Sequence, residues 1–75
     1  MRELVEYIVK SIVAEPDKIN ITEENSDAGL LIKLEVAPED KGRVIGRQGR
    51  VAEAMRTLLR VKAAKDDVRV RLEIL

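Results

Sequence analysis

The sequence predicts a two-layer α+β fold in which three helices cover one face of a three-stranded sheet. Apolar residues recur every three or four positions in three segments and alternate with polar residues in three others. These segments follow one another in the order helix, strand, strand, helix, helix, strand. Each predicted strand has one apolar face, which helices on the same side of the sheet would cover. We therefore predict a single domain over residues 1–75.

The first half of the chain contains one predicted helix and two predicted strands. Apolar residues at helical spacing predict a helix over about residues 1–14, which Pro16 ends. Alternation predicts a first strand over residues 19–22. The turn-forming composition of residues 24–29 predicts a chain reversal, and residues 30–36 form the second predicted strand.

The second half contains two predicted helices and the last strand. Pro38 breaks the second strand, and the negative charge of Asp40 favours the start of a short helix to about residue 45. Beyond a glycine-containing turn, apolar spacing predicts a longer helix over about residues 51–62. Clean alternation over residues 67–74 predicts the third strand.

Composition excludes several classes of protein. The chain has no Cys and no His, so it contains no disulfide and no thiolate or imidazole metal ligand. Glu3, Glu6 and Lys10 interrupt the first apolar pattern, which argues against a signal peptide or a membrane span. We expect a cytoplasmic protein with no metal and no cofactor.

An enzymatic role has little support in the sequence. Without His or Cys, the roles of base and nucleophile fall to carboxylates, Lys10, Ser11 or Thr57, which form no recognisable constellation. We therefore predict that the protein is not an enzyme.

The net charge of zero hides a division of charge along the chain. Residues 1–40 hold four basic and ten acidic side chains, whereas residues 41–75 hold ten basic and four acidic ones. Local potential governs the attraction of a polyanion more than net charge does. The second half of the chain is therefore the part expected to face nucleic acid.

The run GRVIGRQGR, residues 42–50, places a Gly-x-x-Gly turn between the two predicted helices of this basic half. Neither glycine carries a Cβ, so backbone N–H groups of the turn can approach a polyanion closely. The helix that follows directs its positive dipole end to the same place. Arg43, Arg47 and Arg50 add cationic side chains, and a phosphate backbone is the ligand that fits best.

The run from Val44 to Val51 resembles the core motif of the KH domain, a module that binds single-stranded nucleic acid. The predicted order resembles the type II variant of that fold over essentially the whole chain. Within that class the sequence resembles the KhpA family of small bacterial RNA-binding proteins. The resemblance implies a cytoplasmic RNA chaperone or post-transcriptional regulator that forms homodimers, pairs with a larger KH protein, KhpB, and is linked to cell shape and cell-wall biogenesis.

The resemblance also assigns roles within the turn. KH domains clamp the backbone of about four nucleotides with their Gly-x-x-Gly loop while the bases lie in a groove. Carried over, Gly46 and Gly49 permit close approach of phosphates, and Arg47 and Gln48 contact phosphate or sugar. The ligand that the resemblance implies is single-stranded RNA, with single-stranded DNA left open.

The residues that flank the turn have two interpretations each. Val44 and Ile45 either form part of the groove or belong to the core, and we favour the core for at least one of them. Arg43 and Arg50 either contact nucleic acid or are simply solvated.

Cations further along the chain are expected to contribute little. Arg56 and Arg60 lie four residues apart on the polar side of the long helix and add a general electrostatic footprint at most. Arg69 and Arg71 share a strand face that looks away from the helices, which places them outside the groove.

Two features predict a weak grip. In the type II layout, the loop between the first two strands is expected to border the groove opposite the turn, and here it carries Glu23, Glu24 and Asp27. Either this loop points away from the groove or its acidic side chains make the affinity modest. Tyr7 is the only aromatic residue, so stacking platforms for bases are missing. Such a site would work best in pairs, where a second copy raises the effective concentration. The alternative is a KH-fold module that mainly pairs with other proteins.

Overall fold

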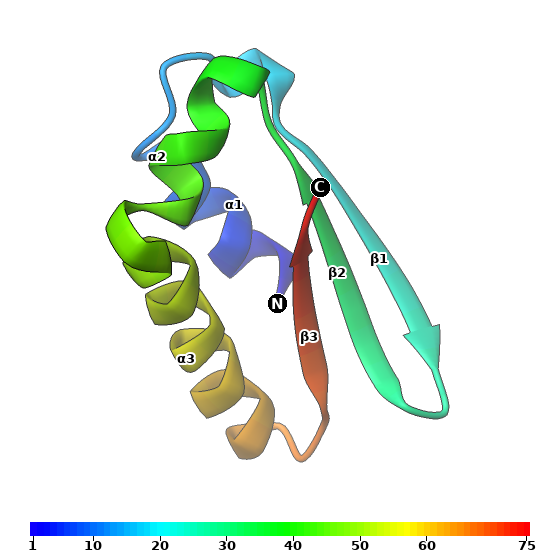
Figure 1. The fold of residues 1–75 in the computed structure, drawn as a ribbon. Helices are drawn as coiled ribbons and strands as arrows, with labels where there is room; N and C mark the ends of the chain where they lie inside the picture. The colour runs from blue at the N-terminus through cyan, green and yellow to red at the C-terminus, as the bar shows by residue number, and fades with distance from the viewer.

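A mixed three-stranded sheet forms one layer of the molecule (Figure 1) in the computed structural model, which describes all residues 1–75. The central strand β2 (Gly29–Glu35) pairs antiparallel with β1 (Asn20–Ser26) and parallel with β3 (Val70–Ile74). The register aligns Ile32 with Leu72. The parallel pair requires a long crossover, which the two C-terminal helices provide.

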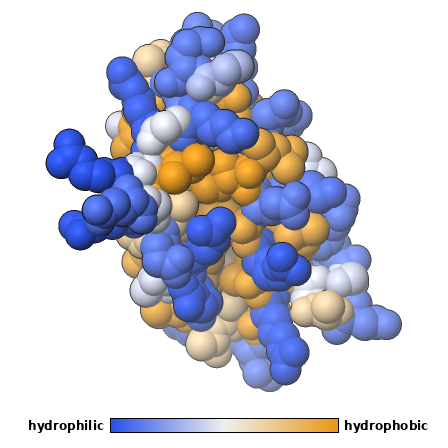
Figure 2. Space-filling model, viewed as in Figure 1, coloured by the Kyte–Doolittle hydropathy of each residue, from blue (hydrophilic) through white to orange (hydrophobic).

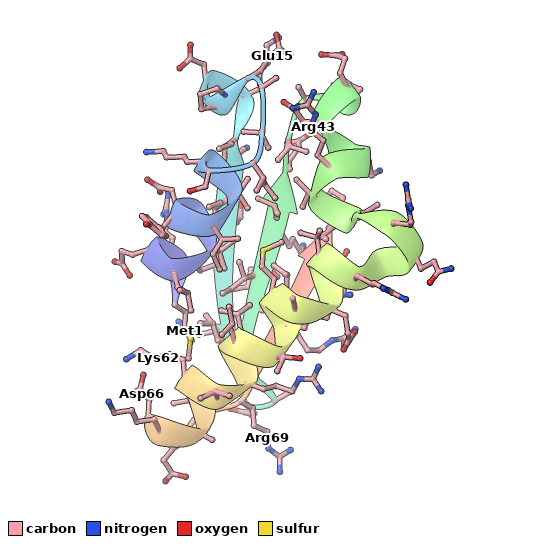
Figure 3. All side chains as sticks on the ribbon, turned by 90° about the vertical axis from the view of Figure 1, so that its left-hand side faces the viewer. Met1, Glu15, Arg43, Lys62, Asp66 and Arg69 are labelled. Carbon is pink, nitrogen blue, oxygen red and sulfur yellow. The ribbon has the colours of Figure 1, made fainter.

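The helices form the second layer on one face of that sheet. They are α1 (Arg2–Lys10), α2 (Lys41–Ile45) and α3 (Arg50–Lys65). Seen from the helix side, α1 and α3 lie in front of the strands (Figure 3). The predicted α+β fold, with three helices on one face of three strands, is confirmed. None of the helices is long and apolar enough to cross a bilayer.

The core lies between these two layers and is almost wholly aliphatic. Alternate residues of β2 point into it, because side chains on a strand change face at every position. The buried side chains that form the cluster come from all three helices and all three strands; they are Val5, Val9, Ile21, Ile32, Leu34, Val36, Val44, Met55, Leu59 and Leu72.

The first helix is shorter than the sequence predicted, ending at Lys10 rather than near Ala14. The helical ladder tightens there, since Ser11 N–H donates to the carbonyl of Ile8, three residues back. The Ala14 N–H then turns away from the helix and donates to the carboxylate of Asp40.

The first strand is longer than predicted and takes in most of the expected turn. Glu23 and Glu24 lie within β1, where they pair with Ile32 and Leu31 of β2. The actual reversal is the two-residue turn at Asp27 and Ala28. Because β1 is an edge strand, its acidic side chains stay solvated while its backbone pairs with β2. This backbone pairing outweighs the low strand propensity of the acidic residues.

The last helix runs further than predicted, and β3 begins later. Asp67 adopts φ 57°, and Val68 N–H donates to the carbonyl of Ala63 across the end of α3. Asp67 N–H donates in turn to Ala64, which completes a Schellman C-cap. Residues 67 and 68 therefore close the helix instead of starting the strand.

Candidate nucleic-acid interface

The Gly-x-x-Gly turn joins α2 to α3 through three residues with positive φ. Gly46 has φ 78° and ψ 172°, a conformation open in practice only to glycine. Gln48 (φ 57°) and Gly49 (φ 73°) both adopt the left-handed region. The backbone therefore turns twice against its usual hand within four residues, which swings the start of α3 sharply away from α2.

The two glycines serve different purposes. A Cβ on Gly46 would lie 2.8 Å from the backbone nitrogen of Val51, so Gly46 allows the turn to pack against α3. No atom lies within 4 Å of a Cβ built on Gly49, so that side of the turn is open.

Backbone donors are available on the same turn. Gly46 N–H donates to Gly42, and Gly49 N–H donates to Gly46. The amides of Arg47 and Gln48 have no acceptor in the protein. Two adjacent free amides on an exposed turn are suited to bind an anion.

The three arginines around this turn are not equivalent. Arg47 is exposed at the turn and has no ion-pair or hydrogen-bond partner on its side chain. Arg50 donates to the side-chain oxygen of Gln48 at 3.3 Å, which holds both side chains beside the turn. Arg43 is the middle residue of α2 and lies on the side of Glu15 (Figure 3), with its Nε 3.9 Å from Oδ1 of Asp40.

The two apolar residues before the turn separate into core and surface. Val44 is fully buried and belongs to the core cluster, as expected for at least one of the pair. Ile45 is exposed beside the turn. Figure 2 shows hydrophobic surface between α2 and the C-terminal end of the chain, with hydrophilic side chains on either side of it.

A separate groove lies between α3 and β3. It has a volume of about 420 Å³, and its lining includes Arg56, Arg60, Arg71 and Leu72. Arg56 is half-buried and donates through Nε and Nη2 to the carbonyl oxygen of Leu72, each at 3.4 Å. Its guanidinium therefore covers a backbone acceptor on the free edge of β3.

Comparison with known proteins places this architecture in a family. The family model described as KhpA/KhpB, KH domain matches residues 2–74. The chain belongs to the KhpA/KhpB KH-domain family.

Relatives within the family match over their full length. The RNA-binding protein KhpA of Listeria monocytogenes is 49% identical, over all of this chain and 99% of its own. Proteins of the same name from Caldanaerobacter subterraneus and Clostridium acetobutylicum are 47% and 44% identical, each over the whole of both chains. No solved structure matched the chain.

Asp40 supports α2 in a way that local sequence did not reveal. Its side chain is 1% exposed, and its two oxygens accept the N–H groups of Ala14 and Glu15, each at 3.0 Å. Those hydrogen bonds lower the pKa of the Asp40 carboxyl, with a smaller contribution from Arg43. Asp40 precedes α2, as predicted, but its carboxylate caps the chain after α1 instead of the helix it begins.

The acidic β1–β2 hairpin points away from the turn, which is one of the two alternatives given for it: its tip and the last turn of α3 lie at the same end of the molecule (Figure 1) and line one hollow. Arg56 is half-buried and hydrogen-bonded to β3, and its electrostatic contribution stays a prediction. The expectation that Arg71 lies outside the groove was wrong. Arg71 lines the groove, because β3 is an edge strand and its outward side chains border the free edge.

The KhpA/KhpB-family chain presents no other obvious centre for chemistry. No group of three or more Asp or Glu side chains converges on a point where a metal ion could bind. Its buried ionisable side chain, Asp40, is satisfied by backbone donors. The candidate nucleic-acid interface therefore consists of the turn and the α3–β3 groove.

Proposed function

We propose that the protein binds single-stranded RNA and that the Gly46–Gly49 turn holds the sugar-phosphate backbone. The observation that carries the proposal is the pair of unbonded amides at Arg47 and Gln48, beside the unpaired guanidinium of Arg47. Backbone amides and arginines are common donors to phosphate. The open side of Gly49 leaves room for the phosphate to approach, and the names of the relatives support RNA as the ligand.

The flanking residues extend this site. Arg50 adds charge beside the turn, and Ile45 offers apolar surface for a base. Arg43 contributes charge from further along α2. Bases would then lie over the groove between α3 and β3, where Arg56 presents fixed donors. A 2′-hydroxyl contact would favour RNA over single-stranded DNA.

We further propose that a single copy binds weakly and that the protein works in pairs, as an RNA chaperone or post-transcriptional regulator in the cytoplasm. No Trp or Phe is present, and Tyr7 lies on α1, so base stacking adds little affinity. A homodimer, or a heterodimer with the larger protein KhpB, would raise the effective concentration of the site. Roles in cell shape and cell-wall biogenesis follow from the family resemblance alone.

Pairing itself is the second candidate function. The side chains of Leu58 and Val61 lie one turn apart on α3 and are 51% and 64% exposed. Exposed aliphatic residues at this spacing form a stripe that a second helix could cover. In this alternative the KH fold serves mainly as an interaction module with little RNA affinity of its own.

The test compares two variants with the same change in charge. Arg47→Asp/Gln48→Asp alters the turn, whereas Arg2→Asp/Asn20→Asp makes the same total change beside α1, on exposed residues remote from the turn. Both are checked for folding by circular dichroism. We expect the turn variant to bind single-stranded RNA at least about tenfold more weakly than wild type and to show a salt slope lower by about one.

The control pair should retain nearly all of its affinity. If the folded turn variant binds as well as wild type, the turn does not hold the RNA. Equal losses in both variants would mean that only the overall charge matters. A parallel titration with DNA of the same sequence measures the preference for ribose.

A further inference from the structure

The groove along α3 does not stop at Leu72. A second hollow of about 570 Å³ follows it toward the last turns of α3, the tip of the β1–β2 hairpin and the start of β3. The two hollows share three lining residues, Arg60, Val70 and Arg71, so the hollows are parts of one continuous groove. The α3 residues that line this hollow, Arg60 to Ala64, lie 10 to 14 residues after Arg50, so the hollow is about 15–21 Å along the helix from the Gly-x-x-Gly turn.

The far hollow has an apolar floor and a cationic rim. Ala63 and Ala64 on α3 leave space above Leu30 and Val68 because their side chains are small. The lining side chains include three arginines and no acidic residue. Arg69 and Arg71 form no ion pair, whereas Arg60 is paired with Glu53 at 2.8 Å.

The backbone beneath Arg69 is held in place. Leu30 N–H donates to the Arg69 carbonyl at 2.8 Å, and a Cβ on Gly29 would lie 2.7 Å from that oxygen. The hairpin and the start of β3 are therefore packed as closely as a glycine allows. Figure 3 shows the Arg69 side chain projecting from this end of the molecule beside the last turn of α3.

We propose that this hollow is a second nucleotide subsite, which takes the part of the RNA strand beyond the segment held at the turn. A base would lie on the apolar floor, and its phosphate would meet the guanidinium groups of Arg69 and Arg71. Concave apolar surface with a few convergent charged groups is typical of ligand sites, and the continuous groove makes the same RNA strand the occupant. This subsite rests on the proposed function of the turn.

The test uses oligouridylates of four and ten nucleotides at 0.15 M salt, where charges more than about 8 Å from the ligand are largely screened. Wild type is compared with Arg69→Ser, because Arg69 lines the far hollow but not the α3–β3 groove, and with a control of equal charge change, Lys18→Ser. Both positions are exposed, and folding is checked by circular dichroism. Since a longer strand offers several registers to any site, the quantity that matters is each variant's loss of affinity relative to wild type on the same probe.

We expect Arg69→Ser to lose about tenfold on the ten-nucleotide probe and less than about twofold on the tetranucleotide. The control should lose less than about twofold on both. Photocrosslinking with 4-thiouridine at successive positions of the long probe should label the peptide around Arg69 from one end of the strand only.

Other outcomes overturn the subsite. Equal losses on both probes, or no loss on the long probe, would show that Arg69 does not contact a strand extended from the turn. No loss on the long probe would leave an acidic protein partner as the occupant of the hollow. If the folded wild type binds neither probe, the proposed function of the turn fails as well, which distinguishes the two failures.

Discussion

The Asp40 carboxylate and the Ala14 backbone are joined by a hydrogen bond of 3.0 Å that spans 26 residues of sequence. A second bond of the same length runs to Glu15 N–H. Together they satisfy two amides that follow the end of α1 and fix the start of α2, the helix that leads into the Gly-x-x-Gly turn. The segment after α1 therefore helps to position the turn, although it makes no other contribution to it.

Replacing Asp40 with Asn should lower the thermal midpoint by about 5–15 °C. An amide side chain has one acceptor oxygen, and its NH₂ group would face the second backbone N–H. Asp66→Asn is the control, because Asp66 pairs with Lys62 on an exposed helix face and should matter little. Similar midpoints for the two variants, measured by circular dichroism, would contradict the role given to Asp40.

The same carboxylate predicts how stability depends on pH. The folded pKa of Asp40 lies below its ordinary value of 3.8. Its stabilising contribution is thus fully present above pH 3.8 and is lost as the pH falls through the folded pKa. Wild type should lose stability over that acidic range, and Asp40→Asn should show a shallower dependence there. Parallel slopes for the two proteins would count against this assignment.

Glu15 and Glu39 should give the opposite dependence. The neighbouring Glu39 carboxyl raises the pKa of Glu15 above its ordinary 4.5. Stability contributed by protonated Glu15 is present below pH 4.5 and is lost as the pH rises through the raised pKa. Glu39→Gln should therefore raise the midpoint at pH 7 by about 2 °C and much less at pH 4.

Glu35→Gln is a suitable control for this effect, because Glu35 is exposed and forms no ion pair. Its midpoint should change little at either pH. A gain for Glu39→Gln that is equal at pH 4 and pH 7 would point to something other than the ionisation of Glu15.

Replacing each of the two glycines of the turn should lower the free energy of unfolding by a different amount. Gly49→Ala places a methyl group in open space with left-handed strain alone, a loss of about 1–2 kcal/mol. Gly46→Ala adds a collision with Val51 in a region restricted to glycine, and should lose about 3 kcal/mol or more. Urea unfolding measures both values, and equal losses would show that Val51 yields without cost.

Sequence periodicity was sufficient for the layers of the fold because each strand and helix carries its own apolar repeat. The Gly-x-x-Gly turn was equally visible, since the conformation of Gly46 demands glycine. Pairings between distant segments were not visible. Nothing local to Arg56 indicates that its partner is the carbonyl of Leu72, 16 residues away. Likewise, the turn-like composition around Glu24 gave no sign that β2 would recruit it into a strand.

Arg56 should stabilise the contact between α3 and β3. Arg56→Met keeps the aliphatic stem but removes the donors to Leu72, and should lower the free energy of unfolding by about 1 kcal/mol. Arg60→Met, which breaks the exposed pair with Glu53 and removes an exposed donor to the Arg56 carbonyl, should cost about 0.5 kcal/mol or less. If the Arg56 variant is no less stable than the Arg60 variant, the contact with the β3 edge has no net value.

Pairing of the protein should depend on the exposed stripe of α3. Leu58→Asp places a charge at the centre of any helix contact but leaves the core untouched, because Leu58 is half exposed and outside the core cluster. We expect wild type to sediment as a dimer. We expect Leu58→Asp to sediment as a monomer that is still folded, which its thermal unfolding transition would show. Val68→Asp, an equally exposed site beyond the end of α3, is the control and should remain dimeric.

A wild type that is monomeric at every concentration, or a Leu58→Asp variant that still dimerises, would remove α3 as the pairing surface. A residual dimer in which RNA binding is unchanged would instead place the contact on another face of the fold.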